Sequence, residues 1–200
     1  MKNVICFVLT TFACSIVFSQ STEEEITQHR ADHLAYLLDT ASGWLSQKEV
    51  DEFGGLDYFD FDESFQVTAK LTKDKGKRFK MPTSTDRLPV YRRYGYIDFM
   101  IGDSSCRLEV YQNMKHRRKK GNKNYLFLPF KDATTRVSTY GGGRFMDLKM
   151  TKSDSILVDF NLAYNPYCAY TYNASCPIPP EVNTLSVSIL AGEKTPLVHK

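Results

Sequence analysis

Residues 128–147, LPFKDATTRVSTYGGGRFMD, form the densest group of residues that could do chemistry. Three consecutive glycines, Gly141, Gly142 and Gly143, can adopt positive φ and turn their amides toward one point, as in an anion-binding nest. Arg144 follows directly, but no Lys-Ser/Thr pair comes after it, so a phosphate loop is not indicated. A β-bulge or a barrel corner is the alternative interpretation of the triplet.

Strand parity predicts where the Arg144 side chain points. Arg144 shares its phase with Met146 and Leu148, so its guanidinium is expected at the core side, at the mouth of a barrel or sandwich. A cation there needs a carboxylate partner or an anionic ligand, because an unpaired buried charge is costly. Asp147 has the opposite phase, which makes Asp132 the better partner. A structural ion pair and a ligand-binding arginine both remain open.

The second dense stretch is residues 159–180, DFNLAYNPYCAYTYNASCPIPP. Its asparagines can satisfy backbone groups in turns, and its tyrosines can either line a cleft or pack a long loop. The leading hypothesis is a non-catalytic binding module for a small anionic ligand, with no cofactor. The candidate ligand-binding residues are Lys131, Asp132, Tyr140, Gly141, Gly142, Gly143, Arg144, Asn161, Tyr164 and Asn165.

Two other function classes stay open beside binding. One is a hydrolase-like enzyme in which Asp132 or Asp159 is the general base and Arg144 or Lys131 stabilises charge. No Gly-x-Ser-x-Gly motif occurs, and neither dense stretch contains histidine, so nucleophilic catalysis with a histidine base has little support. The other is a structural envelope protein without a small-molecule site.

A metal site is not expected. His29 and His33 lie four residues apart, and Glu25 could be a third ligand. The metalloprotease pattern, however, needs a glutamate directly after the first histidine, where this chain has Arg30.

Residues 1–19 are typical of a secretory signal peptide, because Lys2 precedes a short apolar run. Cleavage is expected after Ser19. Cys14 raises the alternative of a lipoprotein anchor, which the residues around it disfavour. The protein is therefore predicted to be exported to the periplasm or the extracellular space, where conditions are oxidising.

An oxidising compartment favours disulfide bonds between cysteines that lie close together. Cys168 and Cys176 lie eight residues apart in a proline-rich loop, and we expect a disulfide between them, with two reduced thiols as the alternative. Cys106 alternates with Leu108 and Val110 and is expected in the core.

The formal net charge is only +3, which excludes a strongly basic nucleic-acid binder as the default. The basic run at residues 115–120, KHRRKK, is expected to be a solvated hairpin loop. In an exported protein its cations could contact an anionic envelope surface; they are Lys115, Arg117, Arg118, Lys119 and Lys120.

The elements that position these residues follow from periodicity. Ser21, followed by three glutamates, is expected to cap an amphipathic helix within a helical segment, residues 20–55. From residue 56 to 194 the apolar period is two, and a tail follows at 195–200. Alternation at residues 65–71, 97–101, 106–110, 125–128, 146–150, 156–162 and 185–189 indicates about eight short strands. We predict a mainly β domain, an antiparallel barrel or alternatively a sandwich, with one N-terminal α-helix.

Six stretches in this order resemble the domain of unknown function 1684 family of uncharacterised bacterial and archaeal proteins. They are YRRYGYIDF (91–99), LFLPFKDAT (126–134), TYGGGRFMDL (139–148), DFNLAYNPYCAY (159–170), CPIPP (176–180) and AGEK (191–194). The resemblance covers roughly residues 30–194. Arg136 departs from it, because the resemblance implies a glycine that closes a turn there. The family implies no activity.

Overall fold

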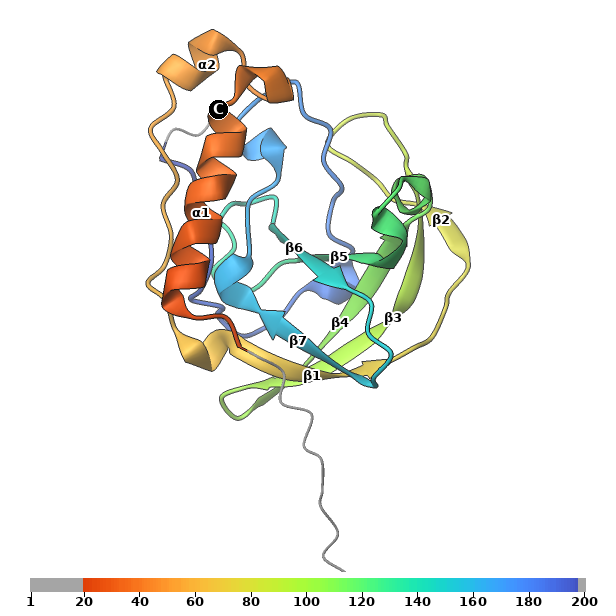
Figure 1. Cartoon of the computed structure of the whole chain (residues 1–200). Coiled ribbons are helices and arrows are strands. Elements are labelled where there is room, and N and C mark those ends of the chain that lie inside the picture. The colour runs from red at the N-terminus through yellow and green to blue at the C-terminus, as the bar shows by residue number, and fades with distance from the viewer. Residues whose placement is uncertain (1–19, 198–200) are drawn as a thin grey trace, which may run out of the picture.

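One antiparallel sheet of seven strands dominates the computed structural model, which describes residues 20–197. The strand order is β6-β5-β4-β3-β1-β7, and β2 pairs with β3 off this path. The sheet curls into a half-barrel, which confirms the predicted antiparallel β class with a helix at its N-terminal side (Figure 1). The strands are β1 (Gln66–Thr72), β2 (Arg78–Lys80), β3 (Val90–Ile101), β4 (Ser104–Asn113), β5 (Tyr125–Phe130), β6 (Arg144–Lys149) and β7 (Ser155–Asp159).

The inner face of the sheet carries the main hydrophobic core. Alternate residues of each strand point to this face, which is why the sequence has a period of two there. Leu108, Leu126, Leu128 and Val158 are completely buried in this core. Cys106 lies in it too, as predicted.

The outer face of β5 and β6 is also covered, and this accounts for the apolar residues at successive positions of β5. Tyr125 and Phe127 point outward while their neighbours point into the core, and Phe127 packs edge-on against Phe145 of β6 with ring centroids 4.8 Å apart. The segment 164–177 packs over this outer cluster through Ala174 and Cys176. The second face of an antiparallel sheet is commonly exposed to solvent, whereas here both faces of β5 and β6 carry packed apolar side chains.

The strand predicted at residues 185–189 is wrong. Leu185 and Ile189 are buried as the alternation requires, but their backbone groups bind a loop instead of a strand. The amide of Leu185 donates to the carbonyl of Lys131 (2.8 Å), and the amide of Ile189 donates to the carboxylate of Asp132 (2.7 Å). At Ile189 the Asp132 side chain therefore accepts the hydrogen bond that a backbone carbonyl of a neighbouring strand would accept in a β-ladder.

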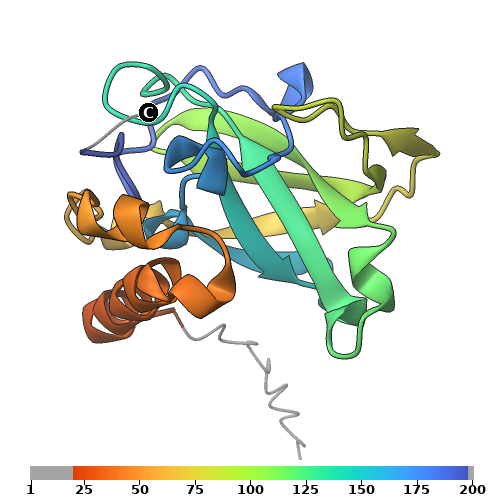
Figure 2. The ribbon, with the colours of Figure 1, turned by 90° about the horizontal axis from the view of Figure 1, so that it is seen from above.

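The helical segment lies along one side of the half-barrel, opposite β2 (Figures 1 and 2). Helix α1 (Glu23–Leu38) starts at a capping box between Thr22 and Glu25, so the cap is Thr22 and not the predicted Ser21. Its buried residues are Ile26 and Leu37. Helix α2 (Gln47–Asp51) follows. Neither of them, nor any other helix within residues 20–197, has the length and apolarity to cross a membrane.

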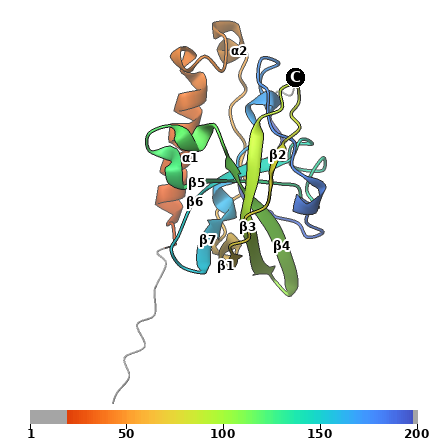
Figure 3. The same ribbon diagram turned by 90° about the vertical axis from the view of Figure 1, so that its right-hand side faces the viewer.

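Short 3-10 helices make most of the remaining connections. They are η1 (Thr40–Ser42), η2 (Glu63–Phe65), η3 (His116–Arg118), η4 (Asn122–Asn124), η5 (Phe160–Leu162), η6 (Tyr167–Ala169) and η7 (Glu181–Asn183). Two of them, η3 and η4, form the basic β4–β5 connection, beside the start of β3 (Figure 3). The predicted signal peptide and Cys14 lie outside the described residues.

Candidate functional site

The guanidinium of Arg144 lies in the core, on the side that strand parity predicted. Its Nη2 is 3.4 Å from Oδ1 of Asp132, and both side chains are only 1% exposed. Nη2 also donates to the carbonyl of Ile189 (2.9 Å), and Nη1 donates to the carbonyl of Ala191. The ring of Phe130 lies 5.2 Å from the guanidinium carbon. The ion-pair alternative is thus confirmed. The Nε–H of Arg144 has no hydrogen-bond partner among the described residues, but the side chain is buried and does not face solvent.

The glycine triplet forms the tight corner that leads into β6. The amide of Gly143 donates to the carbonyl of Tyr140 (3.0 Å), so this amide is already used by the turn. Gly143 has φ of +85°, and a Cβ atom there would lie 2.6 Å from the carbonyl oxygen of Phe130. Its conformation and its close contact with β5 both require glycine. The barrel-corner interpretation accounts for the triplet.

The two predicted general bases are structural carboxylates. Asp132 accepts hydrogen bonds from the hydroxyl of Thr134 (2.8 Å) and from the Ile189 amide, in addition to its ion pair. Asp159 accepts from the side chain of Gln66 (2.9 Å) and from the amide and side chain of Asn161 (3.0 and 2.9 Å). Both are buried, and every carboxylate oxygen already has a donor. Neither is free to accept a proton from a substrate.

The other predicted residues divide between this network and the opposite face. Asn165 binds the buried carboxylate of Glu193 through its amide and its side chain, each at 3.0 Å. Burial raises the pKa of Glu193 to about 8. The half-buried Lys131 donates its backbone amide to the carbonyl of Asn183 (2.9 Å). Tyr164 packs against the outer cluster, where it lines a cavity, and the hydroxyl of Tyr140 lies 3.9 Å from Sγ of Cys168.

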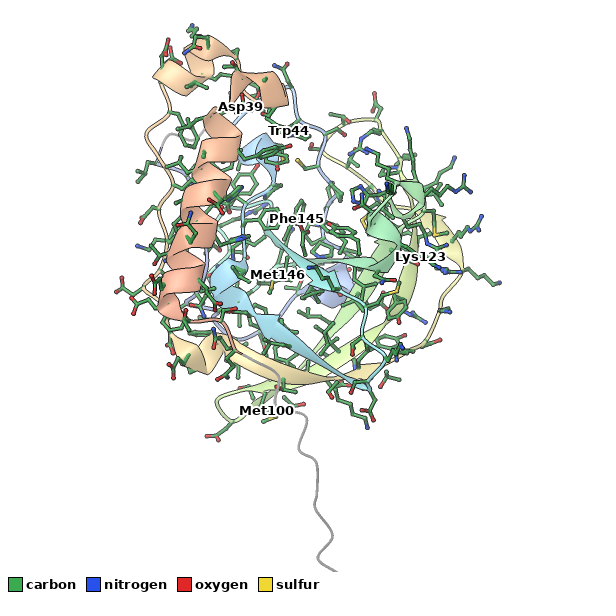
Figure 4. All side chains as sticks on the ribbon, in the orientation of Figure 1. Asp39, Trp44, Met100, Lys123, Phe145 and Met146 are labelled. Atoms are coloured by element: carbon green, nitrogen blue, oxygen red, sulfur yellow. The ribbon has the colours of Figure 1, made fainter. Side chains whose placement is uncertain are left out.

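That cavity, the aromatic cleft, has a volume of about 280 Å³ and lies between the outer sheet face and the segment 164–177. Trp44 from the helical segment stacks on Tyr167 with ring centroids 4.1 Å apart. Figure 4 labels two of the residues that line this cavity, Trp44 and Phe145. Its lining residues are Trp44, Arg87, Tyr91, Asn113, His116, Tyr125, Phe127, Phe145, Tyr164, Pro166, Tyr167, Ser175, Cys176 and Pro177.

Beside the aromatic cleft, the carboxylate of Asp147 is held by two phenols. It accepts hydrogen bonds from Tyr125 (2.7 Å) and Tyr164 (2.8 Å). Burial first, and then the Asp147 charge, raises the pKa of both tyrosines, so they stay neutral donors. A second cavity of about 270 Å³ opens on the far side of Tyr164, where His33 packs edge-on against its ring. Burial lowers the pKa of His33 to about 4.

The opposite end of the aromatic cleft is positively charged. A neighbouring cavity of about 460 Å³ shares Arg87, Asn113 and His116 with it and adds Lys115 and Lys119. We call these two lysines together with Arg87 and His116 the basic mouth. Neither cavity has a carboxylate in its lining. Figure 4 shows nitrogen-bearing side chains gathered on this side of the molecule, around Lys123.

The two cysteines predicted to form a disulfide, Cys168 and Cys176, are free thiols in the structure, and Cys176 lines the aromatic cleft. They are nevertheless in contact, because the backbone amide of Cys168 donates to Sγ of Cys176 over 3.2 Å. Within the described residues no group of three or more His, Cys, Asp or Glu side chains could hold a metal ion.

The sequence singled out Tyr164 but missed most of the cleft. Its lining comes from separate stretches of the chain between residues 44 and 177, and Arg87 and Trp44 belong to no motif. Outward-facing aromatics in β5 and β6 were the available signal, since alternation there leaves large apolar side chains on the face opposite the core.

Comparisons with known proteins agree with this fold. The family described as "Protein of unknown function (DUF1684)" matches residues 51–194. The solution NMR structure of an uncharacterized protein from Haloarcula marismortui is similar, with a TM-score of 0.67 and 34% sequence identity. That match covers 88% of this chain and 96% of the other. No curated protein matches the chain.

Proposed function

Because the chain belongs to the DUF1684 family of proteins of unknown function, we propose its role from the site itself. It is an exported, non-catalytic binding module for a small anionic molecule, and the ligand occupies the aromatic cleft. The apolar body of the ligand lies between the rings, and its acidic group faces the basic mouth. The single observation that carries the proposal is an aromatic cavity that opens onto a cationic entrance.

The lining of the aromatic cleft suits a flat apolar group. Small-molecule sites are concave, mostly apolar and equipped with a few polar groups that orient the ligand. Here Tyr91, Phe127 and Phe145 come from the rigid sheet, and Trp44 is stacked on Tyr167. Aromatic pairs of this kind add to the energy of burial, so an aromatic ligand would gain from both. The volume of about 280 Å³ limits the ligand to a small molecule.

Charge orients the ligand in the cleft. Arg87 is exposed at the entrance, and its guanidinium donates to the Ser175 hydroxyl (3.0 Å), which holds it beside the cavity. A guanidinium can bind a carboxylate or phosphate through two parallel hydrogen bonds. Asp147 lies toward the other end, next to Tyr164, and would repel an acid placed there.

The groups in the cleft favour binding over covalent catalysis. Cys176 and His116 both line it, but the described residues include no hydrogen bond between them. The hydrogen bond with Cys168 and burial raise the pKa of Cys176 well above that of a free thiol. A nucleophile needs an adjacent base or a lowered pKa, and this thiol has neither.

The basic run supports a second proposal, a contact between the exported protein and an anionic envelope surface. Its cations are Lys115, Arg117, Arg118, Lys119 and Lys120, and none of them forms a salt bridge within residues 20–197. Unpaired cations around one loop attract an anionic surface and are screened by salt. Such a contact would bring the basic mouth close to the surface.

Isothermal titration calorimetry with a panel of small aromatic carboxylates and their neutral amides tests the ligand proposal. We expect at least one carboxylate to bind, and its amide to bind about tenfold more weakly, or about 1.4 kcal/mol. Arg87→Gln should remove this preference for the acid. Arg107→Gln is the matched control, because Arg107 is exposed and pairs with Asp98 on the β3–β4 hairpin, outside the cleft lining. The proposal would be rejected if no acid bound, or if the acids bound Arg87→Gln as tightly as Arg107→Gln.

A further inference from the structure

The thiols of Cys168 and Cys176 lie in contact beside the aromatic cleft, which Cys176 lines, and the proposed function does not use them. Cys168 lies in η6, and Cys176 lies eight residues later in the segment that covers the outer sheet face. The Cys168 amide donates to Sγ of Cys176 over 3.2 Å. Backbone and side chains therefore already hold the two residues in contact, so little chain entropy would be lost in linking them.

The environment makes the two thiols unequal. The hydrogen bond from Cys176 lowers the pKa of Cys168 to about 7, and the hydroxyl of Tyr140, 3.9 Å from its sulfur, acts in the same direction. The same contact and burial raise the pKa of Cys176. Cys168 is half-buried, whereas Cys106 is buried in the core and burial raises its pKa. Reactivity follows the thiolate fraction and accessibility, which singles out Cys168.

We propose that Cys168 and Cys176 form a thiol–disulfide exchange site for low-molecular-weight disulfides. The Cys168 thiolate attacks one sulfur of the small disulfide, so a mixed disulfide forms and one small thiolate leaves. The small thiolate released in this first step takes the proton of Cys176, whose sulfur then attacks Sγ of Cys168, and the second small thiolate leaves. In total the protein loses two electrons and two protons, and the small disulfide is reduced to two thiols.

Oxidation would make the segment 164–177, which covers the outer sheet face beside the aromatic cleft, more rigid. Cys176 is anchored on the far side by Ser84, whose hydroxyl accepts from the Cys176 amide (3.1 Å) and whose own amide donates to the Cys176 carbonyl (2.9 Å). A bond to Cys168 would connect that anchor to η6, whose Tyr167 stacks on Trp44. The exchange reaction does not depend on the proposed ligand, because it requires only the two thiols.

The experiment treats the fully reduced full-length chain with oxidised glutathione and follows each cysteine by peptide mass mapping. We expect an internal Cys168–Cys176 disulfide, with Cys106 unmodified. Cys176→Ser should stop at a glutathione adduct on Cys168, and Cys168→Ser should slow any adduct on Cys176 at least tenfold. Cys106→Ser is the control and should react like the parent chain.

The proposal is overturned if Cys168 reacts no faster than Cys106, or if the products are disulfide-linked dimers instead of an internal bond. Peptide mapping separates these cysteines from Cys6 and Cys14, which lie outside the described residues. Ligand binding is measured on the reduced protein, so a failure of the exchange reaction leaves the ligand proposal standing, and the reverse is also true.

Discussion

Replacing Arg144 with methionine tests whether this arginine is a structural group. Methionine fills a similar length of the core but leaves the Asp132 carboxylate without its cation and the carbonyls of Ile189 and Ala191 without their donor. Breaking a buried ion pair by removing one partner costs about 3–5 kcal/mol. The Thr134 hydroxyl and the Ile189 amide still solvate Asp132, so the loss should lie within that range and not above it.

Urea unfolding followed by circular dichroism measures this loss directly. In thermal unfolding of a domain of this size, 1 kcal/mol shifts the melting temperature by roughly 2–4 °C. We therefore expect the melting temperature of Arg144→Met to fall by about 6–20 °C. The Arg144→Met/Asp132→Asn double variant removes the stranded charge and should recover at least about 1 kcal/mol of the loss. If the methionine variant does not fold, Arg144→Lys, which retains a charge, supplies the measurement with a smaller cost.

A loss below about 1 kcal/mol for Arg144→Met would refute the structural role, because a buried pair cannot lose its cation so cheaply. It would also refute the role if the double variant were less stable than the single variant, since the Asp132 charge would then not be the source of the cost.

Three further predictions concern backbone and protonation. Gly143→Ala should lower the free energy of unfolding by more than about 2 kcal/mol, because residue 143 has positive φ and a Cβ there would clash with a β5 carbonyl. In the control Gly141→Ala, the added Cβ meets only the flexible Arg136 side chain. Equal losses for the two variants in urea unfolding would contradict this prediction. Arg136→Gly should raise the free energy of unfolding by about 0.5–1 kcal/mol, measured as a higher melting temperature. The reason is that Arg136 has φ of 67°, a conformation that glycine adopts without strain. Glu193 has a folded-state pKa of about 8, above its unfolded value, so its contribution is complete below about pH 4.5 and is lost as the pH rises through 8. Glu193→Gln should remove this decline, and unchanged pH curves for the two proteins would disprove the assignment.

The conformation of Arg136 shows how a departure from the family can be interpreted. The family resemblance implies a glycine that closes a turn there, and this chain has an arginine instead. The structure has the tight turn all the same, with the Arg136 amide donating to the carbonyl of Thr139 (3.0 Å) and its backbone in the left-handed region. The surrounding hydrogen bonds impose the turn, so the arginine carries the strain.

The disulfide illustrates a different limit of sequence reasoning. Spacing and an oxidising compartment predicted a bond between Cys168 and Cys176, and the structure brings these two residues into contact as free thiols. Proximity was therefore predictable from the short loop, but the oxidation state depends on an oxidant outside the chain. The proposed exchange reaction makes that dependence measurable.

The sequence by itself determined the antiparallel β class, the positions of most strands and the inward direction of Arg144, because side chains alternate across a strand whatever lies beyond it. Only the tertiary structure decided which carboxylate meets that arginine, why residues 185–189 pair with a loop, and where a ligand could fit. The aromatic cleft joins segments that are far apart in the chain, such as those of Trp44, Arg87 and Tyr164. Local periodicity carries no information about which outward-facing surfaces are brought together, since long-range packing sets that.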